Sequence, residues 1–161
     1  MANTDTLTPE QRQLNMKRIK GKDTKPEMLV RRGLHARGLR FRVHDRTLSG
    51  KPDLVFPKHH TIVFVHGCFW HAHGCALSKL PATRKEFWAT KLLENAARDR
   101  RTLELLQADG WRVLIIWECA LRGPLRWAQD TLLDYVANII QSRGLALLEI
   151  AARPTDAAMR T

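Results

Sequence analysis

A short stretch of the chain, from Cys68 to Cys75, gathers residue types that bind metal ions. It reads Cys68-Gly-Phe-Trp-His-Ala-His73-Gly-Cys75, and one further cysteine follows at Cys119. Zn²⁺ takes four soft or borderline ligands in a tetrahedron, and three thiolates with one imidazole form a common set. The spacing lacks the usual pair of Cys-x-x-Cys knuckles, and three buried thiols that only pack are the alternative. We interpret Cys68, His73, Cys75 and Cys119 as a structural zinc site, because apolar packing would not gather two histidines beside the thiols.

A second group of residues could hydrolyse a phosphodiester with a different metal ion. Asp53 ends the turn Gly50-Lys-Pro-Asp53, and His66 and His71 follow the next apolar run. Mg²⁺ is held by one or two carboxylates together with a substrate phosphate, and histidine can move a proton near neutral pH. The Pro-Asp pair alone favours an ordinary turn aspartate. The two histidines and the scarcity of other acids favour a hydrolytic site, which needs a metal ion and a group that helps to deliver water.

Three further residues have two interpretations each. Glu27 completes the capping-box pattern Thr24-Lys-Pro-Glu27, and its spacing alone favours capping over an acid that orients a histidine or a water. Phe69 and Trp70 lie between the proposed zinc ligands and could pack in the core or enter a base step as a wedge. The remaining tryptophans are expected in the core (Trp88, Trp111, Trp117, Trp127). Four histidines are expected at the surface or in turns (His35, His44, His59, His60).

The composition indicates a single domain that binds a polyanion. The chain has 161 residues, 27 Lys and Arg against 16 Asp and Glu, a formal net charge of +11 and a pI near 10.3. The excess is greatest over residues 12–51, where phosphate contact is a better explanation than surface pairing. A membrane surface would also attract this charge. We found no membrane-spanning run and no signal-peptide core, so the chain is expected to be soluble and cytosolic.

Hydrophobic patterning predicts an α/β domain with a central mixed sheet flanked by helices. Helices are expected over 24–37, 84–109 and 125–143, and strands over 39–44, 53–56, 61–66 and 112–117. The predicted organisation is a basic, mobile arm over 1–22 that orders on a partner, a folded domain over 23–149 and a loose tail over 150–161. If strands 61–66 and 112–117 are neighbours, their ends bring Cys68 and Cys119 together.

Four blocks of the sequence resemble the very-short-patch-repair family of DNA mismatch endonucleases. They are Pro52-Asp53, Phe64-Val-His-Gly-Cys-Phe-Trp-His71, Pro81-Ala-Thr-Arg-Lys-Glu-Phe-Trp88 and Gly110-Trp-Arg-Val-Leu-Ile-Ile-Trp-Glu-Cys-Ala-Leu-Arg-Gly123. The resemblance implies a restriction-endonuclease-like fold with an added structural zinc. It also implies an enzyme that nicks one strand 5′ of the thymine in a T·G mismatch. Such mismatches arise when 5-methylcytosine deaminates, and the nick starts very short patch repair.

The resemblance further implies a role for individual residues. Asp53 matches the catalytic aspartate that binds Mg²⁺, and His66 and His71 match the active-site histidines. Glu27 matches an acid that supports the site, which reverses the preference drawn from spacing. The proposed zinc ligands match the family's zinc ligands. The side chains that match those intercalating beside the mismatch are Met16, Phe69 and Trp70.

Two departures from the family pattern affect the site. The family has threonine where this chain has Val65. Valine serves equally well if Mg²⁺ binds the backbone carbonyl at that position, whereas a requirement for the hydroxyl would impair the site. The broader nuclease superfamily also places a second acid-x-Lys element on this strand. Here Val65 and His66 occupy that region, so histidine must take over work usually given to lysine and carboxylate.

Two rival functions remain open on the sequence alone. One is a zinc-stabilised DNA-binding module without catalysis, and the other is a metal-dependent nuclease that ignores mismatches. The resemblance implies double-stranded DNA with a T·G mismatch as the partner, with mismatch-repair proteins as a further partner class. A nick in one strand needs only a monomer, and the expected location is the bacterial cytoplasm, in association with the nucleoid.

Overall fold

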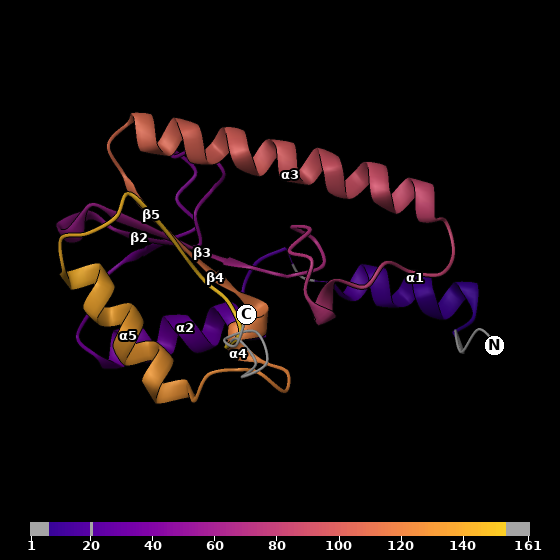
Figure 1. Cartoon of the computed structure of the whole chain (residues 1–161), viewed down its shortest axis with the longest axis horizontal. Coiled ribbons are helices and arrows are strands. Elements are labelled where there is room, and N and C mark those ends of the chain that lie inside the picture. The colour runs from indigo at the N-terminus through magenta and orange to yellow at the C-terminus, as the bar shows by residue number, and fades with distance from the viewer. Residues whose placement is uncertain (1–6, 20, 154–161) are drawn as a thin grey trace, which may run out of the picture.

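The computed structural model describes residues 7–19 and 21–153, which form one five-stranded sheet with its helices (Figure 1). The strands lie side by side in chain order: β1 (Arg42–Val43), β2 (Leu54–Phe56), β3 (Thr61–His66), β4 (Arg112–Trp117) and β5 (Leu147–Ile150). The pairs β1–β2 and β2–β3 are antiparallel, whereas β3–β4 and β4–β5 are parallel. The mixed sheet predicted from the sequence is therefore confirmed.

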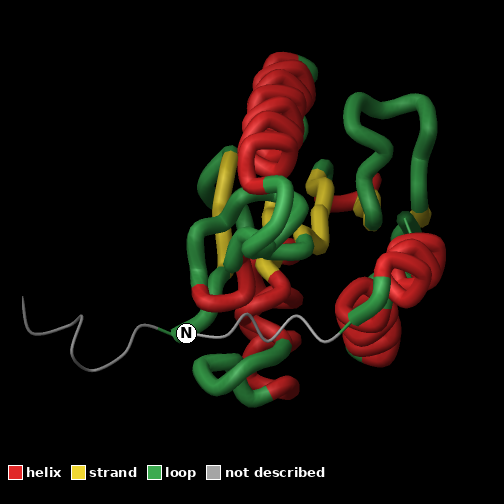
Figure 2. Tube along the Cα trace, turned by 90° about the vertical axis from the view of Figure 1, so that its right-hand side faces the viewer, coloured by secondary structure: helices red, strands yellow, loops and turns green. Residues whose placement is uncertain are grey.

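Helices cover both faces of this sheet (Figures 1 and 2). The long helix α3 (Lys85–Ala108) crosses one face, while α2 (Lys25–Ala36) and α5 (Gln129–Gln141) cover the other. Shorter elements are α1 (Pro9–Arg18), α4 (Glu118–Leu121) and the 3₁₀ turns Pro57–His59 and Ala76–Ser78. None of the helices in the described part of the chain has the length and apolarity needed to cross a membrane.

The core has one layer on each side of the sheet, because alternate strand residues point to opposite faces. On the α2 and α5 face the strands contribute Leu54, Val63, Leu114 and Ile116. On the α3 face they contribute Val55, Ile62, Phe64, Val113 and Ile115. The strand β4 is buried on both faces, as its continuous apolar run predicts.

The position of α2 against α5 depends on the residues at both ends of α2 and on a glycine where the two helices meet. The hydroxyl of Thr24 accepts a hydrogen bond from the Glu27 amide at 3.4 Å, which caps the start of α2. A Cβ at Gly33 would lie 2.3 Å from Cδ1 of Leu133, so only glycine allows this approach of the two helices. Gly38, at φ +82°, follows the end of α2 in the left-handed conformation that glycine adopts readily.

The parallel pair β3–β4 determines where the proposed metal ligands meet. The register pairs His66 with Trp117, the last residue of each strand. Cys68 and Cys119 each lie two residues beyond these strand ends. The expectation that the two strands are neighbours and bring the cysteines together is therefore confirmed.

A helix forms within the basic arm expected over 1–22. The structure contains α1 within residues 1–22, and α1 buries none of its residues. Thr8 accepts a hydrogen bond from the Gln11 amide at 3.2 Å, and the Gln11 side chain accepts one from the Thr8 amide at 2.9 Å. This capping box, with Pro9 at the first position, forms the helix from local contacts. Residues 1–6 and 20 of the expected arm lie outside the described residues.

Three other boundaries also differ from the prediction. The strand expected over 39–44 is limited to β1, the last helix begins at Gln129 instead of Leu125, and β5 was not expected. The strand β5 forms because it pairs with β4, from Val113 opposite Leu147 to Ile116 opposite Ile150, and such pairing is not visible in a short local pattern. Ile150 is therefore part of the sheet, and most of the expected tail, 154–161, lies outside the described residues.

Candidate active site and metal centre

Asp53 immediately precedes β2 and lies beside the last part of β3. The turn before it has two residues at positive φ, Gly50 at +74° and Lys51 at +49°, which redirect the chain into the strand. Backbone pairing between β2 and β3 begins with Leu54 opposite Val63. One residue earlier, the carboxylate Oδ2 of Asp53 accepts a hydrogen bond from the Val65 amide at 2.7 Å. The side chain thus takes the place of a backbone partner and is held rigidly at the sheet.

The surroundings of Asp53 disfavour its charged form. Burial raises the pKa of this carboxyl to about 6, and the nearby negative charge of Glu27 adds to the effect. The Val65 amide and the imidazoles of His44 and His71 act in the opposite direction. A raised carboxyl pKa beside histidines is typical of a functional site, and a bound cation would reverse the shift.

Glu27 belongs to a network of charged and polar side chains around the start of α2. Its side chain is buried, and Oε1 accepts from Arg31 at 2.6 Å and lies 3.0 Å from Nε2 of His44. Asp23 contacts the same two partners, at 2.6 Å from Arg31 and 3.3 Å from His44. Thr24 does cap the helix, but the carboxylate of Glu27 turns toward the interior. His44, which the sequence predicts to be a surface or turn residue, is therefore a half-buried partner of Glu27.

The imidazole rings of His66 and His71 lie face to face. Their rings are stacked, with centroids 3.7 Å apart and planes at 3°. Burial lowers the pKa of His66 to about 3, and the proximity of His71 adds to this. His66 is therefore a neutral imidazole at physiological pH, and its buried Nδ1 has no hydrogen-bond partner among the described residues. A neutral imidazole can donate a hydrogen bond through one ring nitrogen and accept one through the other.

His71 is oriented by Asp99, a residue of α3 that the sequence reasoning missed. Nδ1 of His71 lies 2.5 Å from Oδ2 of Asp99. Although burial raises the pKa of Asp99, the hydrogen bond and charge of His71 outweigh this effect, so that the pKa lies below its ordinary value. The ionised carboxylate only accepts, so Nδ1 carries the hydrogen and Nε2 remains free to accept a proton. Asp99 is 28 positions from His71 in the sequence. The sequence feature that could have identified it is an acidic residue on the side of the predicted helix that faces the sheet.

The four expected zinc ligands come together at the ends of β3 and β4. One ligand atom from each of Cys68, His73, Cys75 and Cys119 lies within 4.8 Å of all the others. Sγ of Cys119 is 3.6 Å from Nδ1 of His73, and a tetrahedral zinc site separates such atoms by roughly 3.5 Å. All three cysteines are free thiols. The arrangement therefore forms a site that could hold a metal ion.

Backbone amides surround this cluster in a way that favours ionised sulfur. The amide of Cys119 donates to Sγ of Cys68 at 3.3 Å, and the amide of Ala152 donates to Sγ of Cys119 at 3.2 Å. Burial raises the pKa of both thiols. A cation among them would favour the thiolates, and such outer hydrogen bonds orient ligands. The ring of His73 is also fixed, since it stacks on Trp117 at 4.1 Å.

The aromatic residues between these ligands pack against the start of α3. Phe69 and Trp70 are half-buried, with ring centroids 5.1 Å apart in an edge-to-face contact. Trp88 of α3 lies 5.3 Å from Phe69 and 5.8 Å from Trp70, and exposed Phe87 lies 5.3 Å from Trp88. We call these four residues the aromatic cluster. Trp88 was expected in the core, but it is half-buried within this cluster.

Met16 lies apart from the catalytic groups, on α1. Its side chain is 48% exposed, so the structure places it on the surface. The helix α1 is at the end of the molecule where α3 begins (Figure 1). Trp88 lies in the first turn of α3, so α1 and the aromatic cluster belong to the same end of the molecule.

A family model described as DNA mismatch endonuclease Vsr matches residues 4–77 of the chain. DNA mismatch endonuclease Vsr of Escherichia coli is 46% identical over 133 residues, covering 83% of this chain and 85% of the relative. Type II nicking enzyme V.XorIIP of Xanthomonas oryzae pv. oryzae is 48% identical over 133 residues, covering 81% and 98%. Type II nicking enzyme V.NmeAIP of Neisseria meningitidis is 41% identical over 120 residues, covering 74% and 86%.

These similarities agree with the geometry of the site. They extend over most of the chain and most of each relative. The chain therefore belongs to the Vsr family of DNA mismatch endonucleases, and it is a nuclease.

Proposed function

We propose that this protein is a Mg²⁺-dependent endonuclease that nicks DNA 5′ of the thymine in T·G mismatches, the first step of very short patch repair. The observation that carries the proposal is the convergence of Asp53 with the Asp99-oriented imidazole of His71 in a chain of this family. The similarity to a mismatch endonuclease and to nicking enzymes supports the same reaction.

The residues present fit a hard divalent cation. Asp53 uses Oδ2 for the Val65 amide, and a carboxylate has a second oxygen with its own lone pairs. The N–H and C=O of one strand residue project to the same side, so the carbonyl of Val65 faces the gap in which Asp53 lies. Asp53 and Val65 would hold Mg²⁺, with Val65 contributing only its carbonyl. Bound there, Mg²⁺ neutralises charge that develops on the phosphate.

The two histidines then have different tasks. His71, held through Nδ1, takes a proton from the attacking water at Nε2. His66 is neutral, and its imidazole orients the water or a phosphate oxygen. Glu27 supports the site through its charge and its contact with His44. In the broader nuclease superfamily, an acid-x-Lys element performs the tasks that we assign here to the two histidines.

Zinc is proposed for the Cys68, His73, Cys75 and Cys119 cluster, in a structural role. Four protein ligands leave no open coordination position for water. The site joins the long loop after β3 to the start of α4, so metal binding should add to folding stability. We also propose that the core has a restriction-endonuclease-like fold. The support for this fold is the mixed sheet with a carboxylate immediately before β2.

Replacing Cys119 with Ser is expected to lower both the metal content and the melting temperature. The variant removes one thiolate from a buried cluster, and structural zinc contributes directly to folding. Metal content by mass spectrometry and thermal unfolding would measure the two effects. Treating the wild type with a strong chelator should reproduce the loss of stability, whereas the variant should respond much less. A variant that retains one tightly held zinc per chain would show that Cys119 is not a ligand.

Phe69, Trp70 and Met16 are proposed to intercalate beside the mismatch. Insertion costs a few kcal/mol of lost stacking, and less at a wobble pair than at T·A. Half-burial of Phe69 and Trp70 is compatible with a cluster that packs on itself and presents its edge to DNA. The basic charge of the chain provides the phosphate contacts.

Replacing both Phe69 and Trp70 with Ala is expected to lower the ratio of T·G to T·A binding by about ten- to a hundredfold. The salt dependence of nonspecific binding should stay the same, because the phosphate contacts remain. Competition binding with the two duplexes measures the ratio. Tyr135→Ala removes an exposed aromatic from α5 and provides the control, which should keep the wild-type ratio. A double variant with the wild-type T·G preference would identify the pair as packing residues.

The remaining parts of the proposal concern organisation and partners. The basic arm over 1–22 contributes Met16 and phosphate contacts, 23–149 is the endonuclease domain and 150–161 is a tail whose first residue joins β5. The protein acts as a monomer on double-stranded DNA in the bacterial cytoplasm, in association with the nucleoid. Mismatch-repair proteins are a second class of partner.

A labelled duplex with T·G or T·A at one position tests the proposed function against its rivals. Nicking should require Mg²⁺ and T·G, and it should occur on the thymine strand at its 5′ side. Equal cleavage of both duplexes would identify a nuclease that ignores mismatches. Binding without cleavage at any Mg²⁺ concentration would identify a DNA-binding module.

A further inference from the structure

Asn95 is a buried polar residue in the middle of the mostly exposed helix α3. Its side chain is 7% exposed. Nδ2 donates a hydrogen bond to the carbonyl of Trp70 at 3.0 Å, and Oδ1 accepts one from Nη2 of Arg98 at 3.2 Å. The carbonyl of Trp70 belongs to the peptide that joins Trp70 to His71. Asn95 therefore holds the one peptide that links the aromatic cluster to the imidazole of the active site.

One face of α3 contacts the loop after β3 at three successive points. Trp88, Asn95 and Asp99 are seven and four residues apart, a spacing that places them on one side of a helix. Trp88 contacts the rings of Phe69 and Trp70, Asn95 binds the following peptide, and Asp99 binds the ring of His71.

The loop itself is tightly folded, so a local shift would reach the histidine. The His71 amide donates to the Gly67 carbonyl at 3.2 Å, the His73 amide donates to the Cys68 carbonyl at 3.0 Å, and Ala72 has a positive φ of 52°. Such a turn has few alternative conformations. A rotation of the Trp70–His71 peptide would therefore move the imidazole away from the position that Asp99 holds.

We propose that Asn95 is a positioning residue that couples the aromatic cluster to His71, so that DNA contact with Phe69 and Trp70 sets the orientation of the imidazole. This inference rests on the proposed nicking reaction and deepens it. It assigns the link between mismatch contact and hydrolysis to a single side-chain hydrogen bond. A purely structural Asn95 would contribute to folding alone.

The test compares single-turnover nicking with equilibrium binding on the T·G duplex. For Asn95→Leu, we expect the nicking rate at saturating enzyme to fall by about ten- to a hundredfold, since small displacements of reacting groups have effects of this size. The Kd for the same duplex without Mg²⁺ should change by less than about threefold, because phosphate contacts dominate affinity. Arg98→Ala leaves the bond to Trp70 in place and should keep the wild-type rate. An unchanged rate for Asn95→Leu, a loss confined to Kd, or an equal loss for Arg98→Ala would overturn the inference.

A double-variant cycle with Asp99→Asn separates coupling from general damage. If both residues act on His71, the double variant should be no slower than the slower single variant, whereas independent effects would multiply and contradict the inference. Asn95→Asp keeps the size and the acceptor for Arg98 but removes the donor, so it replaces Asn95→Leu if the leucine variant does not fold.

The positioning role of Asn95 can also be measured independently of nicking, by hydrogen exchange of the backbone amides. In wild type, the amides of residues 67–73 should be protected from hydrogen exchange, and Asn95→Asp should lose protection at the Trp70–His71 peptide. Equal exchange in the two proteins would overturn the inference. A wild-type chain that nicks neither duplex would contradict the proposed function, and the exchange result would still decide the role of Asn95.

Discussion

Replacing Asp53 with Asn should lower the nicking rate by about three orders of magnitude or more, while binding of the T·G duplex survives. The variant keeps the shape of the side chain but removes the charge that would hold Mg²⁺, and a catalytic metal ion contributes several kcal/mol to stabilising the transition state. Affinity for DNA depends mainly on phosphate contacts, which the substitution leaves in place. Single-turnover cleavage across a Mg²⁺ titration, together with equilibrium binding, measures both quantities.

A neighbouring carboxylate and the pH dependence provide the controls for Asp53. Asp45 contacts Thr47 within its own turn, so Asp45→Asn should keep the wild-type rate. Because the pKa of Asp53 lies at about 6, its charged form increases with pH through that value. At limiting Mg²⁺, wild-type nicking should therefore rise through about pH 6, and the midpoint should move to lower pH as Mg²⁺ increases. The groups that face Asp53 and affect this midpoint are Glu27, His44 and His71. Near-normal cleavage by Asp53→Asn at every Mg²⁺ concentration would exclude this site.

Replacing His71 with Ala is expected to lower the nicking rate by about a hundred- to ten-thousandfold, the range found for a general acid or base. Nδ1 is fixed by Asp99, so the free Nε2 has a defined position and the loss should be in the rate rather than in DNA affinity. Metal content and melting temperature should stay close to wild type, because His73 and not His71 belongs to the Cys/His cluster. Single-turnover cleavage and thermal unfolding together measure these effects.

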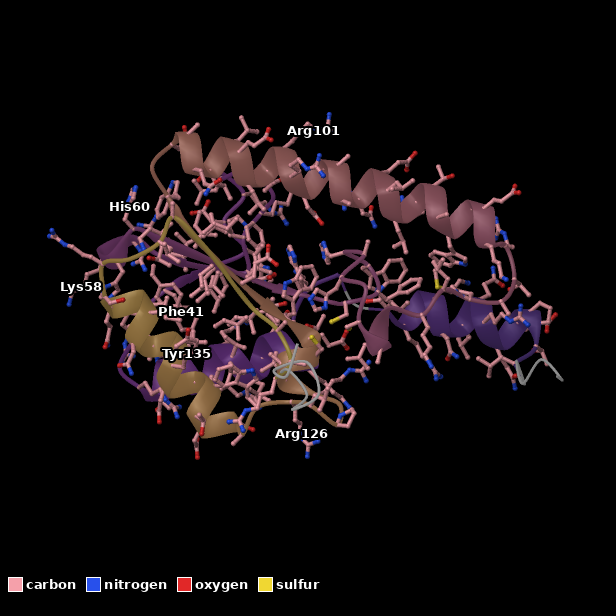
Figure 3. All side chains as sticks on the ribbon, viewed as in Figure 1. Phe41, Lys58, His60, Arg101, Arg126 and Tyr135 are labelled. Atoms are coloured by element: carbon pink, nitrogen blue, oxygen red, sulfur yellow. The ribbon has the colours of Figure 1, made fainter. Side chains whose placement is uncertain are left out.

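The control for His71, which follows β3, is a histidine that precedes the same strand. His59 lies in the 3₁₀ turn before β3, so His59→Ala should cleave T·G duplexes at the wild-type rate. Figure 3 shows how this end is arranged, with Lys58 and His60 at the opposite end of the molecule from α1. A His71→Ala variant that loses less than about tenfold would assign proton transfer to another group.

The sequence alone determined the elements that carry strong local patterns. The run 112–117 forms a buried strand, 61–66 forms its neighbour, and the long amphipathic pattern after Arg84 forms α3. These patterns depend on period and on capping residues, which act over a few positions. The metal-binding set was also visible, because three cysteines in the chain and a nearby histidine leave few combinations.

The boundaries that failed depend on partners elsewhere in the chain. The strand β5 has only four residues and exists because β4 pairs with it. Conversely, α1 forms from a capping box between Thr8 and Gln11. The basic character of the surrounding segment did not indicate a helix. Short strands depend on cross-strand contacts more than on their own residues, whereas a helix can be formed from its own sequence.

The tertiary structure decided which polar residues belong to the active site. Asp99 orients His71 from 28 positions away, and His44 contacts Glu27 across 17 positions. It also moved Trp88 from the expected core into the aromatic cluster and placed Asn95 on the Trp70 carbonyl. Hydrogen bonds and charge effects act over a few ångströms in space, irrespective of distance along the chain. Sequence spacing could therefore identify the groups that do the chemistry, but only the packing of α3 and α2 against the sheet identified the groups that hold them.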